Sequence, residues 1–324
     1  MQSIVILAAL NISAAFDTLD HTTLINRLEH TFGVSHCDGL IRMCRNARIL
    51  LPLSSQNLTS QDVIWSAPRF FVGPRLFTLY VAPIANVISS FGVSHYQYAV
   101  DSQLYIAANR DNIQMKLDLL RDCTAAVNDL FLLNGLSLNL DKSEVLLLGT
   151  AAKLRTIGAV EQVSVAGVSI NTTDSIKNLG VFLDSRLTFN KHVGKVRQSS
   201  YFHIMALKRI RESLSPEVAN TVACAIVGAI LDYFNLILYG TSKYNISRQQ
   251  CVQITLARVV TMTKKFDHIT PVLRRLHWLP IPCMIEYKVA LLALKIRETG
   301  KPSYISHAVK FKEVTRTCRR VALG

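Results

Sequence analysis

The sequence is short of acidic residues. Its 324 residues include 22 Asp and Glu against 36 Lys and Arg, which gives a formal net charge of +14 at pH 7. This excess of positive charge favours a polyanionic partner, such as nucleic acid or an anionic membrane surface. The alternative, that the charge only aids solubility, stays open. Because 50% of the residues are apolar, a disordered chain is excluded and a sizeable core is expected.

The sequence also lacks paired cysteines. Its seven cysteines are scattered, and none forms a Cys-x-x-Cys pair or a Cys/His group with the spacing of a zinc site. Their odd number and irregular spacing argue against a disulfide framework, so we expect ordinary buried thiols. We therefore expect an intracellular protein, nuclear or cytoplasmic, and not a secreted one.

Long apolar runs are absent as well. Residues 222–240 are interrupted by Asp232 and Asn235, and fall short of the ~20 clean apolar residues that a membrane span requires. The apolar run at residues 1–15 lacks the positively charged flank of a signal peptide. We expect a buried helix and a buried strand there instead, and no membrane partner.

Strand and helix patterns alternate in the first part of the chain. An apolar strand at residues 3–10 precedes a helix that Asp20 can cap and Gly33 can end. A second helix is predicted at 111–133 and a strand at 144–148. This alternation predicts a sheet that packs on helices.

The pattern changes near residue 190. Before it, the segments VSVAGVSI and IKNLGVFLD are each predicted as one short strand; after it, long helices rich in basic residues follow. No internal repeat or low-complexity tract occurs. The sequence therefore predicts an α+β fold with one domain at 1–190 and a helical domain at 191–324.

A hairpin pattern carries an unusual turn. Residues 95–108 read HYQYAVDSQLYIAA, in which Asp101 lies at the tip and Val100 beside it. The turn thus presents a single carboxylate next to an apolar, β-branched side chain.

Four motifs, in order, resemble one known family. They are NISAAFDTLDH at 11–21, SAPRFFVGPRLF at 66–77, YAVDSQLY at 98–105 and LSLNLDKSE at 136–144. The chain is similar, over nearly its whole length, to reverse transcriptases (RNA-directed DNA polymerases) of non-LTR, LINE-type retrotransposons. The resemblance implies a polymerase palm, a small antiparallel sheet packed on helices, followed by an all-helical thumb. It also implies nucleotidyl transfer with two Mg2+ ions, an RNA template and a DNA primer.

Two of the family's three metal-binding aspartates are replaced in this sequence. The resemblance places them at Asn11, Val100 and Asp101, of which only Asp101 keeps a carboxylate. Two-metal transfer requires carboxylates that bridge two Mg2+ ions, whereas asparagine is neutral and valine offers no ligand. Asp17 matches a position past the metal ligand and is expected to be structural. We therefore expect weak or lost Mg2+ binding and a catalytically inactive chain.

Other positions also follow from the resemblance. It places Phe16 under the nucleotide sugar, and Pro68 and Arg69 in the loop that helps to hold the template and the incoming nucleotide. That loop is one residue short and lacks two glycines and a glutamine of the family, so its conformation is expected to differ. Lys142 matches a lysine that neutralises or protonates the leaving pyrophosphate. The sequence starts at the first palm strand, so we expect the family's preceding fingers segment to be missing.

The expected thumb carries candidate nucleic-acid contacts. Six basic residues lie there, several of them at helical spacing: Lys191, Lys195, Arg197, Lys208, Arg209 and Arg211. A solvated helix face is the competing interpretation.

Three functions stay open from the sequence. We favour a degenerate, inactive reverse transcriptase. The second is a non-enzymatic module that binds RNA or an RNA–DNA hybrid. The third is an active polymerase, if the sequence carries errors or another chain completes the site. The oligomeric state is also open.

Overall fold

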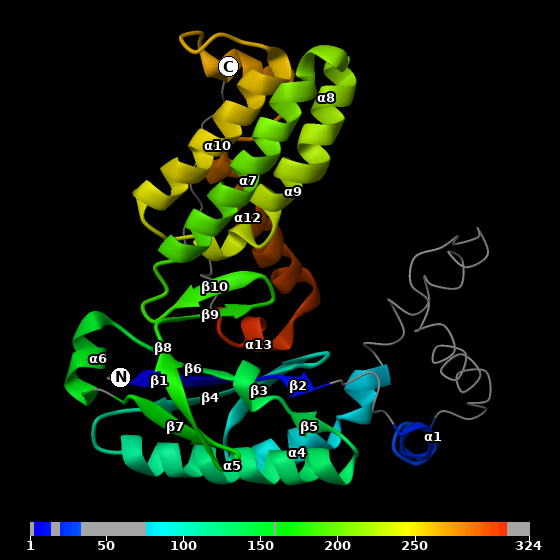
Figure 1. Cartoon of the computed structure of the whole chain (residues 1–324), viewed down its shortest axis with the longest axis vertical. Coiled ribbons are helices and arrows are strands. Elements are labelled where there is room, and N and C mark those ends of the chain that lie inside the picture. The colour runs from blue at the N-terminus through cyan, green and yellow to red at the C-terminus, as the bar shows by residue number, and fades with distance from the viewer. Residues whose placement is uncertain (1–2, 14–19, 34–75, 159, 310–324) are drawn as a thin grey trace, which may run out of the picture. The chain divides into compact units, whose positions relative to one another are not determined.

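The computed structural model describes residues 3–13, 20–33, 76–158 and 160–309. The chain divides into two compact units, Met1–Leu187 and Thr188–Gly324, which are described separately (Figure 1).

The first unit is built around a six-stranded sheet with strand order β3-β4-β1-β6-β8-β7. Its strands are β1 (Ile4–Leu10), β3 (Ser94–Tyr98), β4 (Asp101–Ala108), β6 (Glu144–Leu148), β7 (Gln162–Val165) and β8 (Val168–Thr173). All neighbours pair antiparallel except β6 and β8, which are parallel. The expected antiparallel sheet is therefore mixed and larger than predicted.

Strand β1 lies in the middle of this sheet and is apolar on both faces. Ile4, Ile6, Ala8 and Leu10 point to one face and join the main core beneath α1 (His21–His30), α4 (Pro83–Ser90) and α5 (Ile113–Leu133). On the other face, Leu7 contacts Leu146 and Ile176. A strand buried on both faces needs a nearly continuous apolar sequence, which IVILAAL supplies.

Two predicted single strands are in fact hairpins. The segment VSVAGVSI folds into β7 and β8, and IKNLGVFLD spans β9 (Ser175–Asn178) and β10 (Val181–Asp184). Their two-residue turns, Ala166-Gly167 and Leu179-Gly180, have positive φ at both positions, with values of 48° and 82° in the first and 44° and 82° in the second. Such turns match the twist of a hairpin, but their usual Asn-Gly or Asp-Gly signal is absent here.

The predicted helices of the first unit are confirmed. The side chain of Asp20 accepts bonds from the backbone N–H groups of Thr22 and Thr23 at the start of α1, and Gly33 follows its end with φ of 65°. The predicted helix at 111–133 is α5, and a short helix, α6 (Ala151–Ile157), follows β6. A two-stranded ladder of β2 (Ile12–Ser13) and β5 (Ser137–Leu138) lies apart from the main sheet.

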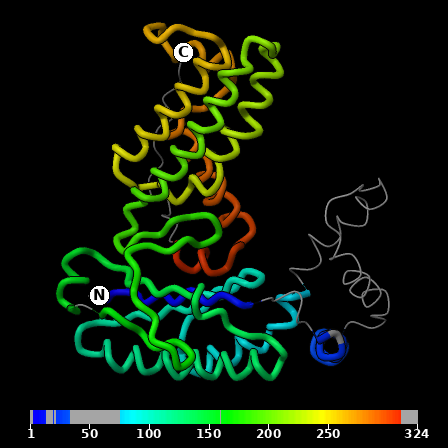
Figure 2. The backbone as a smooth tube through the Cα atoms, viewed as in Figure 1, coloured from blue at the N-terminus to red at the C-terminus, as the bar shows by residue number. Residues whose placement is uncertain are grey.

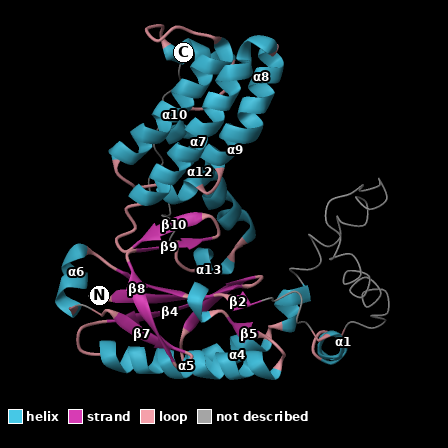
Figure 3. Ribbon diagram, viewed as in Figure 1, coloured by secondary structure: helices cyan, strands magenta, loops and turns pink. Residues whose placement is uncertain are grey.

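The described part of the second unit is helical (Figure 3). Its main helices are α7 (Asn190–Ile210), α8 (Pro216–Ala223), α9 (Ala229–Asp232), α10 (Lys243–Thr261), α11 (Ile269–Arg275), α12 (Ile281–Thr299) and α13 (Ser303–Ser306). The α+β class with a helical C-terminal region is thus confirmed. None of the helices among the described residues combines the length and the apolar composition that crossing a membrane would require.

Helices α7 and α10 lie side by side and start together (Figure 2). At that start, the Asn245 Nδ2 donates to Asn190 Oδ1 at 2.9 Å and to the Thr188 carbonyl at 3.0 Å. Near their other ends, Arg211 Nε donates to the Val260 carbonyl at 2.8 Å. The two long helices therefore run in the same direction.

Candidate functional site

The first and third motifs meet at one end of the sheet. The ladder between β1 and β4 ends with the pair Leu10 and Ser102, so the next residues beyond it are Asn11 and Asp101. Asp101 also pairs with Tyr98 across the two-residue turn of the β3–β4 hairpin. Strand register therefore brings Asn11 and Asp101, which are far apart in sequence, to the same sheet end.

The fourth motif is held against the same point by hydrogen bonds. The Asn139 N–H donates to the Asn11 carbonyl at 2.8 Å, and the Asn11 N–H donates to Ser143 Oγ at 3.3 Å. The hydroxyl of Ser143 in turn donates to the Asn139 carbonyl at 2.8 Å. Lys142, between these residues, is exposed, and its backbone N–H donates to Asn139 Oδ1 at 3.2 Å. Three separate motifs thus converge on Asn11.

Val100 belongs to the packing of the first unit. Its side chain is half-buried and packs against the main apolar core, while Asp101 beside it is also half-buried. Ala99, which precedes it, has a φ of 51°, as the first position of a tight hairpin turn requires. The valine therefore ties the turn to the core of the first unit through apolar contacts.

The described residues at this end of the sheet do not fit a two-metal centre. Of the two predicted ligand positions here that are not valine, Asp101 supplies a carboxylate and Asn11 a neutral amide, and Glu144, which pairs with Ala9, is a further carboxylate near this sheet end. Across the described ranges, no group of three or more His, Cys, Asp or Glu side chains could hold a metal ion. Mg2+ requires several hard oxygen ligands in octahedral geometry, and two ions require carboxylates that bridge them. Phe16, Asp17, Pro68 and Arg69, the other family positions, lie outside the described residues.

Five of the six predicted basic residues are exposed on α7: Lys191, Lys195, Arg197, Lys208 and Arg209. The Arg197 guanidinium lies over the ring of Tyr201, 5.4 Å from its centroid.

Arg211 does not belong to this surface, and its assignment as a contact residue was wrong. It is 7% exposed, and its guanidinium donates to the carbonyls of Val260 and Leu214, each at 2.8 Å. Its position continues the buried stripe of Ser200, Ile204 and Leu207, which recurs every three or four residues. That spacing was visible in the sequence and could have identified it.

Helix α10 adds basic residues that were not predicted as nucleic-acid contacts. This helix carries Lys243, Arg248 and Arg258, and neither α10 nor α7 contains an Asp or Glu. The Arg248 guanidinium lies 5.5 Å from the centroid of the Tyr244 ring. The sequence feature that could have indicated a basic surface on both helices is the absence of Asp and Glu from residues 190–210 and 243–261.

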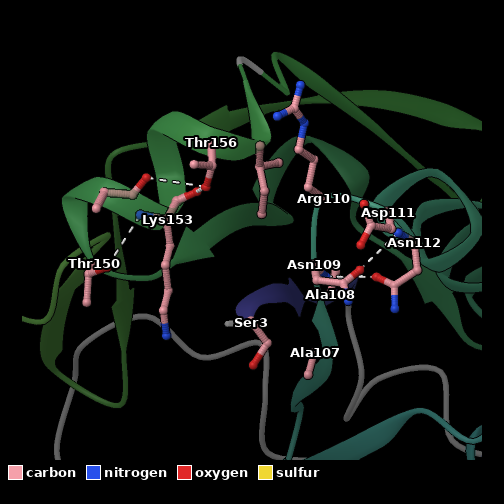
Figure 4. A pocket seen from close by; sticks show the side chains of 12 residues that line it. Ser3, Ala107, Ala108, Asn109, Arg110, Asp111, Asn112, Thr150, Lys153 and Thr156 are labelled. Carbon is pink, nitrogen blue, oxygen red and sulfur yellow. Dashed lines mark hydrogen bonds between the residues drawn. The ribbon is translucent and has the colours of Figure 1, made fainter. Parts of the chain in front are cut away.

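A pocket of about 790 Å³ lies elsewhere in the first unit (Figure 4). It adjoins Ser3 and Ala108, at the end of β1 and β4 opposite Asp101. Its two basic side chains, Arg110 and Lys153, point in different directions (Figure 4). The pocket is therefore separate from the candidate site and does not gather its charges on one point.

Comparisons with known proteins do not identify a family for this chain. No family model and no curated protein matches this sequence. One similar solved structure is telomerase from Candida albicans in complex with a TWJ fragment of telomeric RNA, with 14% sequence identity and a TM-score of 0.30. The similarity covers 85% of this chain and 50% of that telomerase chain, so the chain spans about half its length. A TM-score this low does not establish a common fold.

Proposed function

We propose that this chain is a degenerate reverse transcriptase of the non-LTR, LINE type, with a palm at 1–190 and a thumb at 191–324, that no longer catalyses nucleotidyl transfer. The observation that carries the proposal is the meeting of Asn11, Asp101 and the Asn139–Ser143 segment at one sheet end. These are the positions at which the resemblance places catalytic motifs. Random motif matches would have no reason to converge in space.

The loss of catalysis follows from the donor atoms. One carboxylate can bridge two ions about 3.5 to 4 Å apart, but alone it leaves both ions short of the anionic oxygen ligands that would hold them there. The amide of Asn11 removes one negative charge, and Val100 removes a ligand and its charge. Mg2+ binding at Asp101 is therefore weak or lost, and Lys142 has no reaction to support.

The fold tolerates these replacements. Clustered carboxylates repel one another when no cation is bound, so their removal relieves repulsion. Val100 additionally packs on the core, and valine suits the end of a strand. A palm can thus keep its structure after its chemistry has gone.

The test is primer extension by the full chain on an RNA template, with Mg2+ and separately with Mn2+. We expect wild type and Asp101→Ala to give the same background. Template-dependent synthesis by wild type above the Asp101→Ala control would refute the loss of catalysis.

A second variant reports on metal binding without relying on activity. The double replacement Asn11→Asp and Val100→Asp restores the family's carboxylates, and we expect it to bind Mn2+ more tightly than wild type by calorimetry. Asn11→Gln with Val100→Asn changes the same positions without adding charge and serves as the matched control. Equal Mn2+ affinity in all three proteins would show that these positions do not form a metal site.

The second function we propose is nucleic-acid binding through the thumb. The supporting observation is the pair of parallel helices α7 and α10, which carry five and three Lys or Arg residues respectively and no carboxylate. Contacts with phosphates release condensed counterions, so affinity should fall steeply as salt rises. An RNA–DNA hybrid or RNA is the ligand that the resemblance indicates.

This binding is tested by fluorescence anisotropy over a salt series. Replacing Lys191 and Lys195 with Gln should weaken binding and make the salt dependence shallower by about one unit of slope per lost contact. Arg121→Gln is the matched control, because Arg121 is engaged with Asp118 and Asp122 on α5. A salt-independent affinity, or no binding near physiological salt, would refute the proposal.

A further inference from the structure

The loop that joins α10 to α11 presents an aromatic ring to solvent. Phe266 is 91% exposed, the largest exposed fraction among the large hydrophobic side chains of the described residues. Met262, at the start of the loop, is 61% exposed. A phenyl ring contributes strongly to binding when a partner covers it, so this loop is a candidate contact surface.

The loop is held in place rather than collapsed onto the helices. The Arg258 guanidinium donates to the Lys264 carbonyl and, at 2.9 Å, to the Asp267 carbonyl. The Lys264 N–H donates to Asp267 Oδ2 at 3.1 Å, which closes the turn around Phe266. The ring is therefore displayed by a fixed backbone, with little conformational freedom left to lose on binding.

The helices on either side anchor the loop. Ala257 near the end of α10 packs with Val272 and Leu273 of α11, and Trp278 adds to this small apolar cluster. Phe266 takes no part in that cluster. Figure 1 shows the loop as the orange segment after α10. Because the cluster does not need Phe266, the ring can be changed without loss of local packing.

The surroundings of the ring are strongly basic. Between residues 258 and 275 the chain has five Lys or Arg residues and one acid, Asp267. Four of those cations are exposed: Lys264, Lys265, Arg274 and Arg275. Lys265 Nζ lies 5.8 Å from the centroid of the Phe266 ring. An exposed ring with one lysine beside it, in a segment that carries three more exposed cations, offers stacking and phosphate contacts on one stretch of chain.

We propose that the Met262–Asp267 loop binds single-stranded nucleic acid, with Phe266 stacked on an unpaired base and Lys264 and Lys265 on the flanking phosphates. An aromatic ring stacks on any base, because every base has a π-face, and cations follow the backbone. A single strand is favoured because its bases are open to a ring on a short loop, whereas a duplex must first unstack. The proposal deepens the nucleic-acid binding proposed above and rests on it.

The test compares the binding of a short labelled single-stranded RNA to four proteins by fluorescence anisotropy. Phe266→Ala should weaken binding about tenfold, the size of one lost base-stacking contact. Phe266→Leu should weaken it similarly, since leucine keeps apolar area but cannot stack. Tyr239→Ala, which removes another exposed aromatic ring with 63% exposure, should leave affinity unchanged.

A reporter variant gives direct evidence of stacking. Phe266→Trp should bind as tightly as wild type, and its added fluorescence should be quenched when the RNA binds. Circular dichroism melting of each variant checks that the fold is kept.

The outcomes separate the two proposals. Binding by wild type that Phe266→Ala leaves unchanged would overturn the loop site while the α7 contacts stand. No RNA binding by any protein would overturn the nucleic-acid function and the loop site together. Equal binding of Phe266→Leu and wild type, with retention of both on phosphatidylserine vesicles, would overturn stacking and indicate a membrane surface as the partner.

Discussion

Replacing Val100 with aspartate tests how much the residue at the candidate site contributes to the stability of the first unit. Full burial of a valine side chain contributes about 1.5 to 3 kcal/mol, so the half-buried Val100 contributes about 1 kcal/mol. A second carboxylate beside Asp101 adds repulsion of about 1 kcal/mol at a separation near 4 Å in water-like surroundings. Val100→Asp should therefore destabilise the first unit by about 2 kcal/mol when no cation is bound.

Hydrogen exchange measured by mass spectrometry reports on this unit alone. Peptides that cover β1 and β4 contain the amides of the central ladder, so their protection reports the free energy of opening. Val100→Asn removes the apolar contact without adding charge, and should cost about half as much as Val100→Asp. The difference between the two variants measures the carboxylate repulsion.

Adding Mg2+ should turn the destabilisation by added carboxylates into stabilisation only in a variant that has a metal site. A cation at a hundred times its dissociation constant stabilises the folded state by about 2.7 kcal/mol. The double variant Asn11→Asp, Val100→Asp should therefore regain protection with Mg2+, whereas wild type should not change. Equal protection of Val100→Asp and wild type without metal, or a Mg2+ response in wild type, would refute this reasoning.

Three further predictions concern stability. Burial lowers the pKa of His192 below its usual value of 6.5, so at acidic pH the unfolded chain binds a proton that the folded unit does not. The free energy of unfolding of the second unit should therefore be highest above pH 6.5 and fall as the pH drops below it. Melting curves at several pH values should show that the stability of His192→Asn depends less on pH than that of wild type. Arg211→Met leaves two backbone carbonyls without their buried donor and should cost about 2 to 3 kcal/mol in urea unfolding, whereas the exposed Lys208→Met should change stability by less than about 0.5 kcal/mol. Gly167→Ala should destabilise the β7–β8 hairpin by about 1 kcal/mol through its φ of 82° alone, because an added Cβ meets nothing within 4 Å. Unchanged exchange protection in β7 would contradict that last expectation.

The parts of the fold that depend on local chemistry could be predicted from the sequence. Asp20 caps α1 as its residue type and position indicate, and the apolar spacing of residues 113–133 gave α5 to within two residues. The hairpins at 162–173 and 175–184 could not be recognised, since Ala166 and Leu179 adopt a positive φ that side chains of their type seldom take.

The candidate site shows a second limit of sequence analysis. The resemblance implied that Asn11, Asp101 and Lys142 are related positions, but the sequence alone could not place them together. Their meeting depends on the register of β1 against β4 and on the bonds between Asn11 and Ser143. Arg211 is a different case, because the spacing of Ser200, Ile204 and Leu207 already indicated that its position lies on the buried face of the helix.

The β1–β4 ladder has a consequence for how such a protein changes over generations. Its seven pairs run from Ile4–Ala108 to Leu10–Ser102 and stop one residue before Asn11 and Asp101. Chaperones and proteases respond to chains that unfold, and loss of a carboxylate at either of these two positions leaves all seven pairs of the ladder in place. If the proposed function holds, the cell's quality control therefore has no means of recognising a copy that has lost a carboxylate there, and a folded protein persists after its chemistry has ended.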